Sequence, residues 1–167
     1  AELPRGDFAN AVLRNTMAAT WLKLLWERLA VESKDEELRA IAAKAVKEAR
    51  YHQQHSGDWV VRLGDGTDES RQRMEAALAS LWRFAAELFD TDAADEAAAD
   101  AGWGPRWSEL KAPWQAEMQQ ILSEAGLTMP AESKFQSDGK RGRHSEHMGF
   151  ILADMQYLQR AFPGGVW

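Results

Sequence analysis

Cysteine is absent from this sequence, and its other scarce features also narrow what the protein can be. Without cysteine there are no disulfides, iron–sulfur clusters, zinc–thiolate sites or cysteine nucleophiles. The composition therefore favours a reducing compartment, and we expect the cytoplasm. No stretch approaches the roughly 18 uninterrupted apolar residues of a membrane-spanning helix, so we expect no membrane partner. Proline occurs only five times, between candidate helices or at the ends of the chain.

Basic residues are fewer than acidic ones. The sequence has 20 Lys and Arg against 26 Asp and Glu, which gives a formal net charge of −6. A basic surface for nucleic acid is therefore not expected. The 167 residues are 45% hydrophobic and 28% charged, which is enough apolar material for a folded core. The length predicts a single domain over residues 1–167.

Hydrophobic residues recur at steps of three and four, which predicts helices throughout the chain. Thr67 is a candidate N-cap, and Gly64 and Gly126 are candidate residues just beyond helix ends. The first helix is apolar on nearly every side, which is typical of a helix buried on several sides or pressed against a partner. We predict an all-α bundle with helices over about residues 6–31, 34–63, 68–90, 106–125 and 144–161. The connectors are residues 91–104, with a short helical turn, and the irregular loop 127–143.

The densest polar group on an apolar face lies in the second predicted helix. Glu48, His52 and His55 are separated by four and three residues and share a helix surface with Lys44. A carboxylate-bridged di-iron site in a bundle would need Glu-x-x-His on two helices. None of the four histidines has a glutamate three positions before it. We therefore predict a buried polar network of Lys44, Glu48, His52 and His55, with no metal site. The alternative is a metal-binding bundle that uses Glu48, His52 and His55.

A basic cluster lies where a glycine-containing loop enters the last predicted helix. Its members are Lys140, Arg141, Arg143, His144 and His147. Arginine and lysine at a helix N-terminus can hold an anion such as phosphate, so contact with an acyl-CoA is one interpretation. The spacing of a phosphate-binding loop is absent. We therefore favour a solvated or partner-facing surface, and the acyl-CoA interpretation stays open.

Three collinear parts of the sequence resemble one known family. They are residues 40–52 (AIAAKAVKEARYH) with 62–68 (RLGDGTD), residues 81–90 (LWRFAAELFD), and residues 144–149 (HSEHMG) with 155–160 (MQYLQR). Together they are similar to the C subunits of bacterial phenylacetyl-CoA epoxidases, and the similarity extends over essentially the whole sequence.

The resemblance implies a ferritin-like helical bundle. It also implies a non-catalytic, structural role in association with a related di-iron protein, the catalytic A subunit, and possibly with the other epoxidase subunits. The complete enzyme would epoxidise the aromatic ring of phenylacetyl-CoA with oxygen and reducing equivalents from a reductase. No cofactor and no catalytic residue is then expected in this chain. Where the family's metal site would carry a ligand pair, the sequence reads Glu48-Ala49-Arg50-Tyr51.

The resemblance also bears on the length of the chain. Family members have two further helices before the position of Ala1, and this sequence does not begin with methionine. We therefore expect a C-terminal fragment of the family chain, with apolar surface exposed around Trp21 and Trp26. The apolar face of the first predicted helix and the basic loop 140–147 are the candidate contacts with the catalytic di-iron subunit.

Overall fold

The computed structural model describes residues 2–3, 5–135 and 137–166 and divides the chain into two compact units. We call residues 5–136 the helical bundle, and residues 1–4 with 137–167 the C-terminal unit. The sequence predicts a single domain, whereas each of these units is compact by itself. Helices account for the regular structure of the described residues in both units, which confirms the predicted all-α class and agrees with a ferritin-like bundle.

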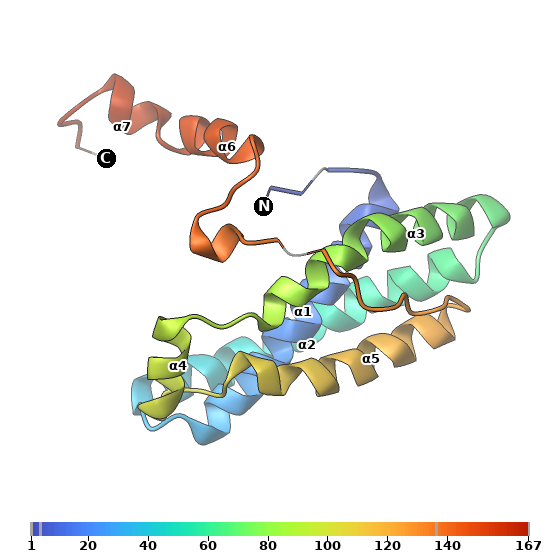
Figure 1. Cartoon of the computed structure of the whole chain (residues 1–167), viewed down its shortest axis with the longest axis horizontal. Coiled ribbons are helices and arrows are strands. Elements are labelled where there is room, and N and C mark those ends of the chain that lie inside the picture. Colours follow the sequence, from blue (N-terminus) through green and yellow to red (C-terminus); the bar gives the residue numbers. More distant parts are fainter. Residues whose placement is uncertain (1, 4, 136, 167) are drawn as a thin grey trace. The chain divides into compact units, whose positions relative to one another are not determined.

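The helical bundle is built around its first helix. In chain order its elements are α1 (Phe8–Glu32), α2 (Glu36–Gly64), α3 (Asp68–Leu81), the 3-10 helix η1 (Trp82–Phe89), α4 (Ala93–Asp100), the 3-10 helix η2 (Trp107–Leu110) and α5 (Lys111–Glu124). Helix α1 packs most extensively against α2 and also contacts α3 and α5 (Figure 1). The expectation from the sequence that α1 is buried on several sides is therefore confirmed.

Short polar side chains start the long helices. Asp7 accepts a hydrogen bond from the backbone N–H of Asn10 at 3.1 Å, while the Asn10 side chain accepts one from the backbone of Asp7. The Asp35 side chain caps α2 by accepting a hydrogen bond from the backbone N–H of Leu38 at 2.9 Å. Thr67 accepts from the backbone of Ser70 and caps α3, as the sequence predicts. Each cap satisfies a backbone donor that the first turn of a helix leaves without a partner.

The two glycines proposed as helix ends behave differently. Gly126 follows α5 with φ of +65°, the left-handed conformation that glycine adopts without strain, so this prediction is confirmed. Gly64 is instead the last residue within α2, and Asp65 is the C-cap. Glycine is needed there because a Cβ atom would lie 2.5 Å from the backbone oxygen of Ala125. The predicted role of Gly64 is therefore wrong, and close packing between α2 and the end of α5 is the reason for this residue.

Two predicted helices are interrupted. The segment 68–90 is α-helical only to Leu81 and continues as η1, where the buried Trp82 and Ala85 follow the three-residue period of a 3-10 helix. The segment 106–125 likewise begins as η2 before α5. The connector 91–104 contains the short helix α4, in agreement with the predicted helical turn.

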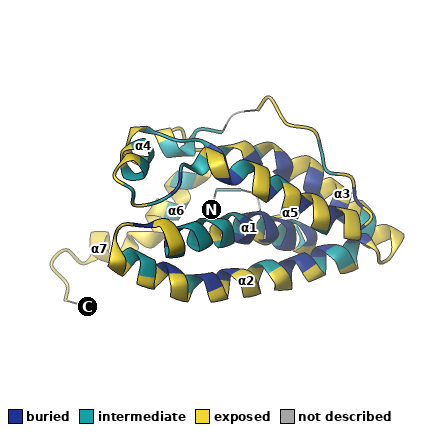
Figure 2. Cartoon of the chain, turned by 90° about the horizontal axis from the view of Figure 1, so that it is seen from below, coloured by how far each residue is buried: buried dark blue, intermediate teal, exposed yellow. Residues whose placement is uncertain are grey.

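The core of the helical bundle lies between α1, α3, η1 and α5 (Figure 2). Its largest fully buried side chain is Trp114, which packs against Trp82 and Phe89 with ring centroids 5.3 and 5.4 Å apart. Trp21 and Trp26, expected to be exposed, are half-buried. Trp21 contacts the ring of Trp107 edge-on at 5.0 Å, so η2 covers apolar surface that the sequence predicts to be open.

The C-terminal unit contains the 3-10 helix η3 (Gly139–Arg141), α6 (His147–Met155) and α7 (Tyr157–Ala161). The predicted helix 144–161 therefore starts three residues later and is broken at Gln156. Just before this start, the backbone N–H and the hydroxyl of Ser145 both donate to the Glu2 carboxylate. Large hydrophobic side chains of α6 and α7 are exposed, among them Phe150, Met155, Tyr157 and Leu158.

Candidate functional site

The polar residues singled out on α2 lie at the surface. Lys44, Glu48, His52 and His55 are all exposed, so the predicted buried polar network is wrong. The face of α2 that packs into the bundle carries mostly small residues, and the polar residues lie on the opposite side. The buried residues of α2 are Ala42, Val46, Ala49, Ser56, Gly57, Val60 and Gly64. The rings of His52 and His55 instead contact the exposed ring of Tyr51, each with a centroid separation of 5.8 Å.

A different polar cluster lies partly buried between the helices of the helical bundle. The carboxylate of Glu117 on α5 accepts from Lys23 Nζ of α1 at 2.5 Å and from the side-chain amide of Gln53 on α2. The amide of Gln53 also donates to Thr20 Oγ1 at 3.1 Å. The side chains of Lys23 and Glu117 are only 14% and 28% exposed, so their opposite charges balance each other in a partly desolvated place. The cluster joins α1, α2 and α5.

Sequence reasoning missed this cluster because its members lie on three separate helices. Gln53 is the neighbour of His52, yet at 100° per residue it points to the buried side of α2 while His52 points outward. Thr20 and Lys23 are three residues apart in α1 and share a face, which is the only local signal. Nothing in the sequence pairs that face with Glu117.

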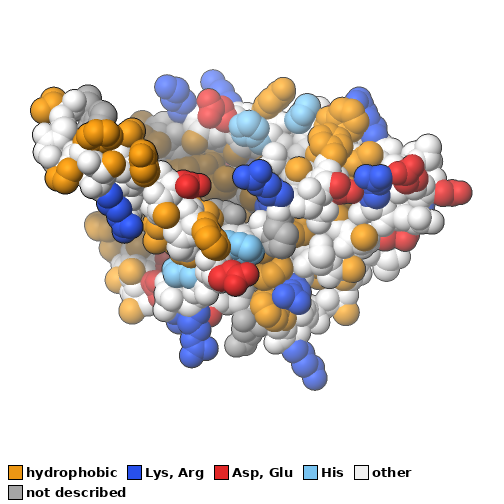
Figure 3. All heavy atoms as spheres, turned by 90° about the horizontal axis from the view of Figure 1, so that it is seen from above, with side chains coloured by type: hydrophobic (Ala, Val, Ile, Leu, Met, Phe, Trp, Pro, Cys, Tyr) orange, Lys and Arg blue, Asp and Glu red, His pale blue; other side chains and the backbone are white. Residues whose placement is uncertain are grey.

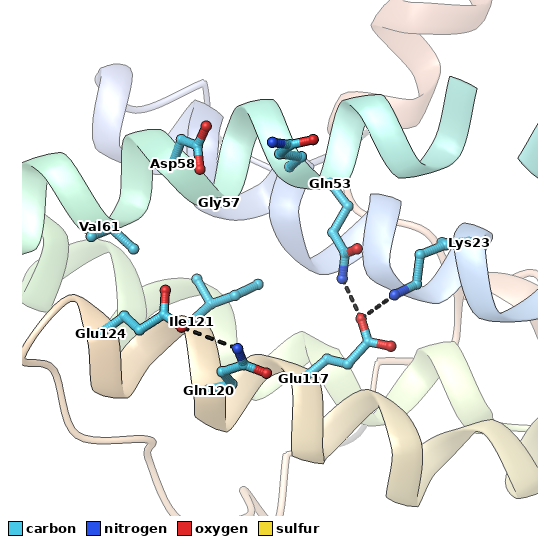
Figure 4. A pocket seen from close by; sticks show the side chains of 10 residues that line it. Lys23, Gln53, Gly57, Asp58, Val61, Glu117, Gln120, Ile121 and Glu124 are labelled. Carbon is cyan, nitrogen blue, oxygen red and sulfur yellow. Dashed lines mark hydrogen bonds and ion pairs between the residues drawn. The ribbon is translucent and has the colours of Figure 1, made fainter. Parts of the chain in front are cut away.

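A cleft of about 400 Å³ opens beside this cluster between α2 and α5 (Figure 4). Its remaining lining is polar at Gln54, Asp58, Gln120 and Glu124 and apolar at Gly57, Val61 and Ile121. Among the described residues, no serine, threonine, histidine or cysteine lines the cleft, so it offers no hydroxyl or thiol nucleophile beside a base. Within the described residues, the Glu117 carboxylate accepts from both Lys23 and Gln53. The hydrogen bonds of Glu117 join α1, α2 and α5, so the geometry supports a structural polar contact between these helices.

The alternative interpretation of α2 is a metal site that uses Glu48, His52 and His55. In the described part of the chain, no group of three or more His, Asp or Glu side chains is placed to hold a metal ion. The histidines of α2 and those of the C-terminal unit belong to different compact units. Together with the missing Glu-x-x-His spacing, the residues present do not fit a di-iron centre.

The basic cluster of the C-terminal unit is partly neutralised by its own carboxylates. Asp138 pairs with Arg141 at 3.1 Å and with Arg143 at 3.6 Å. His144 Nδ1 lies 2.8 Å from the Glu2 carboxylate. The hydrogen bond from the Ser145 side chain, followed by that to His144, lowers the pKa of Glu2 to about 2. The residues just before α6 therefore already bind the carboxylate of Glu2.

The cluster nevertheless stays partly accessible to solvent. The side chain of Arg143 is 84% exposed, His147 is also exposed, and Lys140 is half-buried. This surface can therefore contact a partner or an anion in addition to Glu2. Within the described residues, no helix is both long enough and apolar enough to cross a membrane.

Comparison with known proteins gives two findings. A family described as phenylacetic acid catabolic protein matches residues 1–167. The chain is also 47% identical over 166 residues to the C subunit of the 1,2-phenylacetyl-CoA epoxidase of Escherichia coli strain K12. That similarity covers 99% of this chain and 66% of the relative, so the chain spans slightly less than two thirds of the relative's length.

Proposed function

Because the chain belongs to the phenylacetic acid catabolic protein family, we propose that it acts in phenylacetate catabolism as one subunit of a phenylacetyl-CoA epoxidase. The identity of 47% along 99% of the chain supports this assignment. It also confirms the resemblance inferred from the sequence. Such an enzyme converts a coenzyme A thioester, and the cytoplasm is the compartment we propose for it.

Within that complex the chain is a non-catalytic, structural subunit. The observation that carries this proposal is the missing Glu-x-x-His spacing at every histidine of the sequence. The exposed positions of Glu48, His52 and His55 support it, because di-iron ligands project into the interior of a bundle. The chain then holds no cofactor of its own, and the di-iron centre belongs to the catalytic A subunit.

The partner surface includes the exposed C-terminal unit. Phe150, Met155 and Tyr157 are 70%, 72% and 65% exposed, which is unusual for large apolar side chains on neighbouring helical turns. The basic cluster 140–147 borders them in the sequence. Apolar anchors with a charged rim are typical of protein–protein interfaces. We therefore assign this unit to the contact with the catalytic partner.

Reversing the charge of Arg141 and Arg143 tests that assignment. The double variant Arg141→Glu/Arg143→Glu should bind the catalytic partner at least about tenfold more weakly, because two like-charge contacts would replace favourable ones. A binding titration of the purified subunits measures the change. The matched control is Arg39→Glu/Lys47→Glu, which makes the same charge change on α2 and should leave the affinity unaltered. Equal affinity of the Arg141/Arg143 variant and the wild type would remove the cluster from the interface.

The alternative is that Lys140, Arg141 and Arg143 contact an acyl-CoA. It predicts a different result for the wild type and the same double variant. If these side chains bind the coenzyme phosphates, then calorimetry with phenylacetyl-CoA and the isolated chain should show binding that the double variant loses. The acidic lining of the cleft at Glu117, Asp58 and Glu124 offers no second place for those phosphates.

A further inference from the structure

The segment that follows α5 has no regular secondary structure, yet it is attached to the helical bundle at several points. Residues 127–135 form neither helix nor strand. Just before them, Arg71 of α3 donates to the backbone oxygen of Gly126 at 2.9 Å, and Leu127 at their start is buried. From there the segment returns along α5 (Figure 1). We call residues 127–135 the strap.

An ion pair holds the second half of the strap on α5. The Glu132 carboxylate pairs with Lys111 Nζ at 2.8 Å and accepts a hydrogen bond from the Gln115 side chain at 3.2 Å. The hydrogen bond from Lys111 and its positive charge lower the pKa of Glu132, so this carboxylate is ionised at neutral pH. Both partners of the ion pair are largely exposed, with 42% and 69% of their side chains open to solvent. Salt should therefore screen this contact.

A second contact of different chemistry holds the end of the strap on η1. The guanidinium carbon of Arg83 lies 4.9 Å from the ring centroid of Phe84 and 4.2 Å from that of Phe135. The two rings meet edge-on at 5.2 Å, a favourable geometry for an aromatic pair. Arg83 and Phe84 belong to η1, so they fix Phe135 on the helical bundle. The packing of the rings does not depend on charge, and salt should leave it in place.

The strap leads directly into the C-terminal unit. The longer segment of that unit begins at residue 137, two residues after Phe135. Hydrophobic side chains are exposed on this unit (Figure 3), which we assign to the contact with the catalytic partner. A binding surface that is already held in place loses less conformational freedom on binding than one that hangs on a flexible linker. The contacts of the strap therefore bear on how well the C-terminal unit binds.

We propose that the strap is a two-point latch, which fixes the place where the chain leaves the helical bundle and so pre-organises the C-terminal unit for its partner. Phe135 provides the stronger point, and Glu132 provides a weaker one that salt can open. The strap residues are then positioning residues, because they act on binding through the C-terminal unit. The pre-organisation rests on the proposed partner contact of that unit, whereas the latch is a property of the chain by itself.

Trypsin digestion of the chain tests the latch without a partner. Lys134 lies between the two contacts, so trypsin can bind the surrounding segment only when the strap is released. Arg83→Ala should speed cleavage after Lys134 by about fivefold, and Lys111→Ala should speed it by about two- to threefold at low salt. At about 0.5 M salt the wild type should be cleaved as fast as Lys111→Ala, while the effect of Arg83→Ala remains.

Arg62→Ala is the matched control for Arg83→Ala. Arg62 also lies over an aromatic ring, that of Trp59 at 5.3 Å, but outside the strap. Its removal should leave cleavage after Lys134 unchanged. The midpoint of urea denaturation should stay at the wild-type value in both variants, because both arginines are exposed. Equal cleavage of Arg83→Ala and the wild type, or a lowered midpoint that accounts for faster cleavage, would overturn the latch.

A binding titration with the catalytic partner tests the pre-organisation. Apparent affinity falls in proportion to the fraction of chains with a closed strap, so the variant must leave the strap mostly open. Lys111→Ala/Phe135→Ala removes both contacts and should bind at least about fivefold more weakly. Phe135→Tyr keeps a ring beside Arg83 and should bind like the wild type.

The two measurements separate the latch from the proposed function. Faster cleavage of Lys111→Ala/Phe135→Ala with unchanged affinity overturns the pre-organisation. Weaker binding of this variant without faster cleavage assigns the strap to the interface itself and also overturns it. A wild-type chain that does not bind the catalytic partner contradicts the proposed function and the pre-organisation together. The cleavage rates decide the latch in that case as well.

Discussion

Replacing Trp114 with alanine should lower the free energy of unfolding by about 3–5 kcal/mol, the usual cost of removing a large aromatic side chain from a packed core. Trp114 is 1% exposed and contacts the rings of Trp82 and Phe89. Its indole N–H donates to the backbone oxygen of Met17 at 2.9 Å and so joins α5 to α1. The variant loses the packing and leaves that acceptor without its donor. Urea denaturation followed by circular dichroism measures the loss.

Trp103→Ala is the matched control for Trp114. Trp103 is 55% exposed, so the same truncation should change the free energy of unfolding by no more than about 0.5–1 kcal/mol. Similar destabilisation by the two variants would show that Trp114 is not at the centre of the core.

Gly64→Ala should destabilise the chain by about 2 kcal/mol or more, although alanine normally favours a helix. The added Cβ would lie 2.5 Å from the backbone oxygen of Ala125, and backbone cannot move aside as a flexible side chain can. Either α2 and α5 separate or the end of α5 distorts. The midpoint of urea denaturation measures the effect.

Gly57→Ala in the same helix is the control and should have the opposite sign. Its added Cβ would meet only the Ile121 side chain at 3.5 Å, an ordinary contact. Replacing a glycine within a helix by alanine should then stabilise the chain by about 0.5–1 kcal/mol. If Gly64→Ala were as favourable as Gly57→Ala, the close approach of α2 to Ala125 would be refuted.

Local signals in the sequence predicted much of the fold. The steps of three and four located every long helix, and Thr67 and Gly126 marked a start and an end because capping depends only on neighbouring backbone. The predicted role of Gly64 is wrong because the residue that requires glycine there, Ala125, lies 61 positions later in the sequence. The change from α3 to η1 at Trp82 is also set by packing, as this ring lies against Trp114.

The sequence predicts less of the candidate site than of the fold. The sequence placed Lys44, Glu48, His52 and His55 on one helix surface, and they do share one. It could not tell which side of α2 faces inward, because small residues rather than large hydrophobic ones line the packed side. The cluster of Lys23, Gln53 and Glu117 could not be predicted from the sequence, because each of three helices contributes only one of these side chains.

The central claim is that this chain is a structural subunit whose catalytic metal lies in a partner protein. Native mass spectrometry of the tagged chain, purified with its associated proteins from cells growing on phenylacetate, tests it most directly. We expect the chain in a fixed ratio with a larger subunit, and iron that stays with the larger subunit when the complex is dissociated. A chain recovered alone with stoichiometric iron, lost in the variant His52→Ala, would contradict the account.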